Sequence, residues 1–181
     1  MKPLTALTLL PLLLTACANP VNRATSDNYT QTCSIAESNV QLDIAEQACY
    51  RALVNVDWGN LGPELKSQRL YNLGRIKRKL AKFSESEQLF KESLAIEERL
   101  PERSSLRIGR RLVELSVSLA SQNKLSEGAE YLERVLPIAN QFPSQERIYT
   151  AEVLKEYAKS LRAMNKIALA ERFESQALAL R

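Results

Sequence analysis

A repeat with a 42-residue period constrains this chain more than any other feature of its sequence. Three segments align without gaps and begin with a lysine, at residues 82–90, 124–132 and 166–174. The halves upstream match at the same offset, through Leu73-Gly74, Leu115-Ser116 and Tyr157-Ala158. A fourth, degenerate copy aligns around residues 42–52 at an offset of 41. A unit of this length cannot bury its apolar side alone, so the pattern predicts a core that neighbouring units share.

Each unit has the pattern of two amphipathic helices. Leu, Ala, Glu, Lys and Arg dominate the composition, and β-branched residues do not alternate with a period of two, so we expect no strands. The first helices are predicted over 64–80, 103–121 and 145–164, and the second helices over 84–99, 126–141 and 167–180. Pro101 and Pro143 lie between units, where a helix must stop. Ser84 and Glu87 have the spacing of a capping box at the start of a second helix.

Small residues recur where the two helices of a unit are expected to cross. The first full unit shows this pattern in Leu70, Leu73, Gly74, Ser86, Phe90 and Ser93. At this spacing the sequence resembles the tetratricopeptide repeat, in the long-helix form found in kinesin light chain. The resemblance implies an all-α, right-handed α-solenoid of about three to four stacked antiparallel helix pairs over residues 31–181.

The N-terminus has the features of an export signal. Lys2 precedes an apolar stretch over residues 4–14, which is too short to span a bilayer. The segment Leu14-Thr15-Ala16-Cys17 resembles the bacterial lipobox. This implies a signal peptide over residues 1–16 and a lipid anchor on Cys17. Because Ala18 rather than Asp follows, the resemblance favours the outer membrane, facing the periplasm. Residues 17–30 are then predicted to be the lipidated cysteine and a flexible tether.

The other two cysteines, Cys33 and Cys49, form an even pair in a chain predicted to be exported. A disulfide is the simplest interpretation, and their spacing along the chain suits a bridge across the two arms of a helical hairpin. The alternative is a pair of buried free thiols. The sequence contains no histidine and no further cysteine, so we expect no metal site.

In the tetratricopeptide family the first helix of each unit lines a concave groove. Carried over to this sequence, the family's groove positions predict a partner-binding surface of Tyr71, Arg75, Arg78, Lys79, Arg110, Lys155 and Lys159. The surface is basic, with no acid except Glu152 near the rim, so it suits an acidic peptide segment or a C-terminal carboxylate. The alternative is that these cations form an ordinary solvated helix face.

Composition and motifs together favour a binding protein over an enzyme. The formal net charge of +4 is too small to indicate nucleic-acid binding, and no catalytic motif or cofactor site is recognisable. We therefore expect a non-catalytic periplasmic adaptor that recruits or assembles envelope proteins. The alternatives are a protein that binds or modifies the cell wall, and a lipid-tethered spacer. Apolar residues of the last helix, Phe173, Leu178 and Leu180, are candidates for contact with a second copy, and Trp58 is expected to cover the end of the core.

Overall fold

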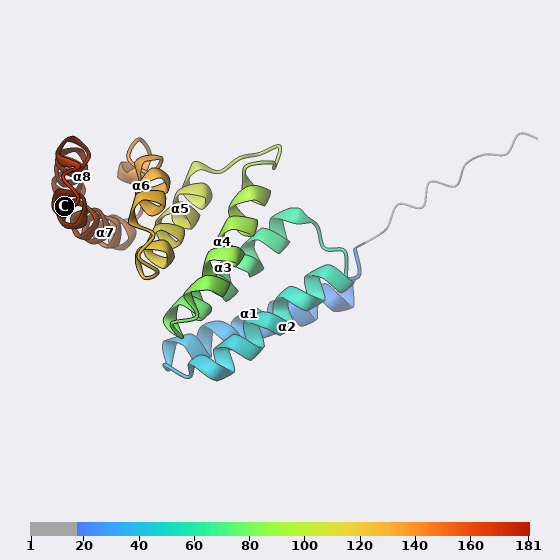
Figure 1. The fold of residues 1–181 in the computed structure, drawn as a ribbon. Helices are drawn as coiled ribbons and strands as arrows, with labels where there is room; N and C mark the ends of the chain where they lie inside the picture. Colours follow the sequence, from blue (N-terminus) through green and yellow to red (C-terminus); the bar gives the residue numbers. More distant parts are fainter. Residues whose placement is uncertain (1–17) are drawn as a thin grey trace, which may run out of the picture.

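Four helical hairpins stack one after another in the computed structural model, which describes residues 18–181 (Figure 1). The helices are α1 (Pro20–Ser38), α2 (Leu42–Trp58), α3 (Pro63–Lys79), α4 (Phe83–Glu97), α5 (Ser105–Ala120), α6 (Leu125–Glu133), α7 (Ser144–Ala163) and α8 (Ile167–Ala179), with a 3₁₀ turn, η1, at Ala139–Gln141. No strand occurs within residues 18–181. The prediction of stacked antiparallel helix pairs is confirmed, and five of the six predicted helices match to within two residues.

The turn inside each hairpin shows that the repeat of the sequence is also a repeat of backbone conformation. One residue per turn has a positive φ, between 58° and 62°, at Val40, Ala81, Asn123 and Asn165. The amide that follows it donates to a carbonyl five residues back in the preceding helix, at 2.9 Å in all four turns. This is the left-handed cap that commonly ends a helix.

Small residues at the helix crossings allow the two helices of a hairpin to approach closely. A Cβ atom on Gly74 would lie 2.8 Å from Cε1 of Phe90 in the same hairpin, and one on Gly128 would lie 3.3 Å from Cβ of Leu119 in α5 and 1.9 Å from the hydroxyl of Tyr157 in the next hairpin. The hydroxyl of Ser86 donates to the carbonyl of Gly74 at 2.9 Å. The crossing positions predicted from the repeat are therefore confirmed.

The N-terminal hairpin packs differently from the other three. The three later hairpins share one large core, whereas around α1 and α2 the buried apolar residues are mostly small: Cys33, Ala36, Ala45, Ala48 and Cys49, with Leu73 and Ile76 of α3. The predicted disulfide is present, joining Cys33 to Cys49 with their Cα atoms 5.2 Å apart. The bridge thus fixes α1 to α2 where there is little apolar area to do so.

The prediction of a flexible tether over residues 17–30 is wrong for residues 20–30, which form the first half of α1. The segment is rich in Asn, Ser and Thr, which are poor helix formers in isolation. Here Asn19 caps the helix, with its side-chain oxygen accepting from the amide of Val21 at 3.0 Å. Ser26 is fully buried and donates to the carbonyl of Ala52 in α2 at 2.9 Å. Packing against α2 therefore overrides the weak local propensity.

Two further predictions about helix ends are wrong. The helix predicted over 126–141 ends at Glu133, because Pro137 four residues later cannot donate an amide and its ring would clash with the carbonyl of Glu133. The predicted capping box at Ser84 and Glu87 does not form, since α4 begins at Phe83 without a side-chain cap. Glu87 instead binds Lys91, Lys124 and Gln122.

Exposure at the two ends of the stack also differs from expectation. In α8, Phe173 and Leu180 are buried, and of the three apolar candidates for contact with a second copy only Leu178 is exposed. Trp58 does not cover the core, because it ends α2 with 77% of its surface exposed.

Candidate functional site

A hollow lies along the first helices of the three full repeats. It contains two cavities. The first, of about 470 Å³, is lined mainly by α3 and α5 and by the start of α7. The second, of about 560 Å³, is lined by α5, by α7 and by Arg78 at the end of α3. Tyr149 lines both cavities, and we call the pair the groove.

Four of the seven predicted groove residues line these cavities. Tyr71, Arg75 and Arg110 line the first cavity, and Arg78 lines the second. Lys79 lines neither, although it pairs with Glu37 next to Arg75.

Lys155 and Lys159 of α7 also line neither cavity. The residues that α7 presents there are Tyr149, Glu152, Val153, Glu156, Tyr157 and Ser160. Because α7 belongs to the last hairpin, the residues that line the groove are those that face α5. The positions carried over by the 42-residue offset lie on a different side of α7 from the residues that line the second cavity, so Lys155 and Lys159 are not among the residues lining either cavity.

The groove is not the uniformly basic surface that the sequence predicts. Arg75 pairs with Glu37 at 2.5 Å, Arg78 with Glu114 at 2.7 Å and Arg110 with Glu146 at 2.8 Å. Two of these acids, Glu114 and Glu146, line the first cavity themselves. The first cavity is therefore lined by four arginines and two glutamates, and the second by one arginine and two glutamates.

Two tyrosines give the groove its aromatic surface. Tyr71 packs under Arg111, whose guanidinium carbon lies 5.1 Å from the ring centroid, within the range of a cation–π contact. Burial raises the pKa of Tyr149 to about 12, so the phenol stays protonated at any physiological pH. The hydroxyl oxygen of Tyr149 is buried and has no hydrogen-bond partner within the described part of the chain. An unsatisfied buried hydroxyl is costly, so the hydroxyl of Tyr149 would gain from an acceptor supplied by a bound molecule.

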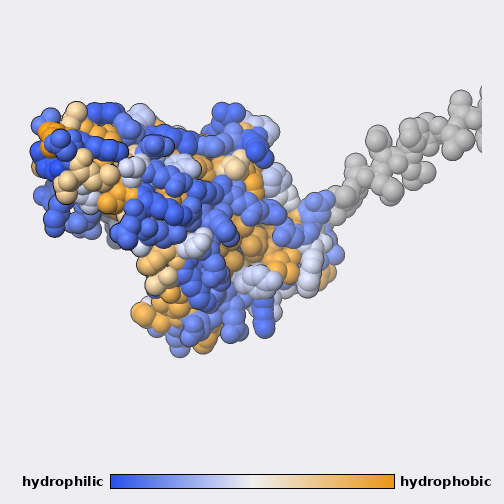
Figure 2. Space-filling model, in the orientation of Figure 1, coloured by the Kyte–Doolittle hydropathy of each residue, from blue (hydrophilic) through white to orange (hydrophobic). Residues whose placement is uncertain are grey.

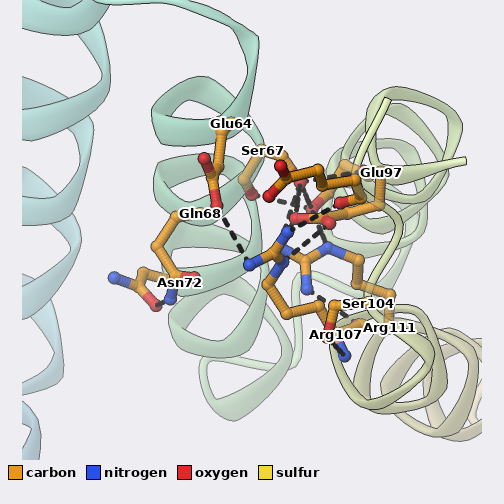
Figure 3. A network of polar contacts seen from close by, with 10 residues as sticks. Glu64, Ser67, Gln68, Asn72, Glu97, Ser104, Arg107 and Arg111 are labelled. Carbon is orange, nitrogen blue, oxygen red and sulfur yellow. Dashed lines mark hydrogen bonds and ion pairs between the residues drawn. The ribbon is translucent and has the colours of Figure 1, made fainter. Parts of the chain in front are cut away.

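Below the first cavity lies a buried ionic network centred on Arg111 and Glu97, which are 1% and 0% exposed (Figure 3). Their ion pair measures 2.9 Å, and the guanidinium also donates to Ser93 at 2.7 Å. A second arginine, Arg107, approaches the other carboxylate oxygen of Glu97 at 2.9 Å. Ser67 bridges the pair, accepting from Arg111 at 2.9 Å and donating to Glu97 at 3.0 Å. The network joins α3, α4 and α5, and two of its members, Arg107 and Arg111, also line the first cavity.

The same position carries a buried arginine one repeat earlier. Arg69 is 6% exposed, pairs with Asp27 at 2.5 Å and donates to Ser26 at 3.1 Å. One repeat later the position is Val153, which is buried and lies in the apolar core. Two junctions of the stack are therefore polar and one is apolar. The sequence analysis missed these polar junctions. The sequence does carry a signal for them, because Arg69 and Arg111 lie 42 residues apart and their serine partners, Ser26 and Ser67, are also one repeat apart.

The proposed lipid anchor and a metal site are the remaining features to consider. The lipobox and Cys17 lie outside the described residues. Over residues 18–181, no helix combines the length and apolarity needed to cross a bilayer. The same residues contain no cluster of three or more His, Cys, Asp or Glu side chains arranged to hold a metal ion.

Comparison with known proteins bears on the fold. No protein-family model matches the sequence, and a search of curated proteins returned no match. Among solved structures, BtubC (BKLC) from P. vanneervenii matches with a TM-score of 0.74 and 20% identity, over 88% of this chain and 64% of that one. A kinesin light chain of nearly identical TPR-like repeats from Podosopora anserina matches with a TM-score of 0.64 and 18% identity, over 86% of this chain and 74% of that one. This chain thus spans roughly two thirds to three quarters of the solved chains. The four stacked hairpins and these similarities show that the chain has the fold of the tetratricopeptide-like (TPR-like) repeat proteins.

Proposed function

We propose that this protein is a non-catalytic scaffold that binds an extended segment of another envelope protein in the groove, and that a lipid on Cys17 holds it at the outer membrane. TPR-like repeats generally mediate contacts between proteins, and their stacked hairpins present an elongated binding surface. The groove of this chain has the same origin, since α3, α5 and α7 are the first helices of successive repeats.

The observation that carries the proposal is the hydroxyl of Tyr149. It is buried, it has no partner within residues 18–181, and its residue lines both cavities. The surrounding arginines are held in ion pairs, so the groove is already ordered before a partner arrives. With a shift of the side chains that cover it, a backbone carbonyl or a side-chain oxygen of a bound segment would accept a hydrogen bond from the hydroxyl. Preorganisation of this kind reduces the entropic cost of binding.

The charges of the groove favour a partner segment of mixed charge. Arginines outnumber glutamates around the first cavity, so an acidic group of the partner fits near Arg75 and Arg110. The second cavity has the opposite balance, and a basic or neutral group fits near Glu152 and Glu156. This replaces the acidic segment that the sequence alone favours.

The proposed location depends on sequence features alone. The lipobox Leu14-Thr15-Ala16-Cys17 supports lipidation, and Ala18 supports sorting to the outer membrane. The disulfide between Cys33 and Cys49 is consistent with an oxidising compartment such as the periplasm. Intact-mass measurement of protein extracted from membranes tests the anchor. We expect a chain that begins at Cys17 and carries acyl chains, and a chain that retains residues 1–16 would contradict the anchor.

The groove is tested first by photocrosslinking in the native envelope. A photoreactive amino acid in place of Gln68 or Val117, one in each cavity, should capture a defined partner. The same amino acid in place of Lys159, which lines neither cavity, is the matched control. Equal capture from all three positions would contradict the groove as the binding surface.

Binding of the identified partner is then compared between two variants that change the net charge equally. Arg75→Glu with Arg110→Glu reverses two cations in the first cavity, and Lys155→Glu with Lys159→Glu reverses two outside it. We expect about a tenfold or greater loss of affinity for the first variant only. Tyr149→Phe is the finest probe, because it removes only the unpartnered hydroxyl. It should weaken binding without lowering the stability of the free protein, and unchanged binding in both Tyr149→Phe and the first charge variant would refute the proposal.

A further inference from the structure

The first described residues are tied tightly to the end of α2. The amide of Asn19 donates to the carbonyl of Gly59 at 3.0 Å, and the side-chain amide of Asn22 donates to Asn55 at 3.3 Å. Only two residues separate Cys17 from Pro20, the first residue of α1. Three peptide steps span at most about 11 Å, so a lipid on Cys17 would hold this end of the hairpin close to the bilayer surface.

At this end of the hairpin two large apolar side chains are exposed to solvent. Val21, in the first turn of α1, is 71% exposed, and Trp58, the last residue of α2, is 77% exposed. Because α1 and α2 are antiparallel, the two residues belong to the same end of the hairpin (Figure 1). Figure 2 shows hydrophobic surface over the N-terminal hairpin that extends toward the end where the described residues begin.

The apolar side chains belong to one face of each helix. Val21 and Ile35 are separated by close to four helical turns, and so are Ile44 and Trp58, which places the members of each pair on the same side of their helix. Ile35 and Ile44 are 54% and 52% exposed. Each helix of the hairpin therefore carries exposed apolar side chains near both of its ends, and none of these four residues belongs to the hairpin's buried core.

Most acidic side chains of the hairpin are engaged by α3. Four of its five carboxylates pair with cations of α3, in the pairs Asp27–Arg69, Glu37–Arg75, Glu46–Lys77 and Asp57–Lys66. The fifth, Asp43, lies at the start of α2, which is the far end from Pro20. An anionic lipid surface would thus meet no unpaired carboxylate of this hairpin beside Val21 and Trp58.

We infer that the α1–α2 hairpin rests on the lipid bilayer at its anchored end, with Trp58 and Val21 in the boundary between headgroups and acyl chains. Tryptophan is favoured at that boundary because its ring is apolar while its N–H remains hydrated. The inference rests on the proposed anchor at Cys17, since the lipid is what brings this end to the membrane. Beyond the proposed function, the inference states that a defined surface of the protein contacts the membrane, so that the helical domain is not joined to its lipid by a long flexible linker.

The chain contains a single tryptophan, so its fluorescence reports on this contact directly. The full-length protein, processed and lipidated in a bacterial host, is reconstituted into phosphatidylethanolamine–phosphatidylglycerol vesicles. We expect Trp58 emission to shift to shorter wavelength relative to detergent solution, and to be quenched by lipids brominated near the top of the acyl chain, at a depth of about 5–10 Å. The control is Trp58→Phe with Ile148→Trp, which moves the probe to an exposed position on α7. Its emission should be insensitive to the brominated lipids.

Flotation of the vesicles reports on the anchor separately. Protein that floats with the vesicles but shows no quenching of Trp58 would overturn the inference and leave the anchor intact. Protein that does not float would refute the anchor, and the inference with it. A blue shift of Trp58 that depends on protein concentration in detergent would identify a second copy on this face and would also overturn the inference.

Discussion

Replacing Glu97 by glutamine is expected to destabilise the protein more than replacing Arg111 by methionine, although the two residues form one buried ion pair. Without Glu97, Arg111 loses the carboxylate that it pairs with while it remains 1% exposed. Burial lowers the pKa of Arg111 only to about 10, so the guanidinium stays charged at pH 7 and lacks a counterion. Breaking a buried pair in this way costs about 3–5 kcal/mol, and we expect a loss of about 5 kcal/mol for Glu97→Gln.

The opposite substitution leaves a better-compensated charge. In Arg111→Met, Glu97 keeps its contact with Arg107 at 2.9 Å and still accepts from Ser67. We therefore expect a loss of about 3 kcal/mol. Replacing both residues, as Arg111→Met with Glu97→Leu, removes both buried charges and should cost about 1–2 kcal/mol, which is well below the sum of the single losses.

The assay is urea unfolding followed by far-ultraviolet circular dichroism, arranged as a double-mutant cycle. Arg69→Met is the matched control from the previous repeat. The carboxylate of its partner Asp27 is 50% exposed and can be hydrated again, so we expect a loss of only about 1 kcal/mol. Equal losses for Arg69→Met and Arg111→Met, or additive losses in the Glu97–Arg111 cycle, would refute the reasoning.

Three further predictions concern the disulfide, a turn and a buried carboxylate. Replacing Cys33 and Cys49 by serine should lower the free energy of unfolding by about 3 kcal/mol relative to the oxidised protein, measured by urea unfolding, and reduction of the native protein should cause a similar loss. Val40→Asn should raise the melting temperature by relieving about 1 kcal/mol of backbone strain, because Val40 has a φ of 59°. The equivalent position of a later turn already holds an asparagine, Asn123, and a lower melting temperature of the variant would contradict this prediction. Burial would raise the pKa of Glu87, but hydrogen bonds from its lysine and glutamine partners lower it to about 2, below its ordinary value of 4.5. Its contribution is therefore complete above pH 4.5 and is lost as the pH falls toward 2, so Glu87→Gln should cost about 2 kcal/mol at pH 7 and much less at pH 2, by urea unfolding at each pH.

Features that repeat along the chain could be predicted from the sequence. The 42-residue period located the hairpins, the prolines between them and the small residues at the crossings. The disulfide also followed, since the spacing of the two cysteines suits a helical hairpin. Each of these depends on residues close in sequence or on a fixed offset, and both are visible without a structure.

The charge balance of the groove could not be predicted in the same way, because it depends on pairs between different hairpins. Glu37 and Glu146 reach arginines 38 and 36 residues away in the chain. The pattern of one helix shows its own arginines, but it does not show the acids on other helices that neutralise them. The start of α1 could not be predicted for a related reason. The burial of Ser26 against α2 outweighs the low helix propensity of the segment around it.

The bridge between Cys33 and Cys49 has a mechanical consequence. A force applied to the N-terminal end of the described chain acts first on the hydrogen bond between Asn19 and Gly59 and then on the turns of α1. Unwinding of α1 stops at Cys33, because there the covalent link transfers the tension directly to Cys49 in α2. Residues 34–48 lie inside the closed loop and cannot be stretched, so the turn between α1 and α2 stays closed while the load passes to the part of the chain that follows Cys49.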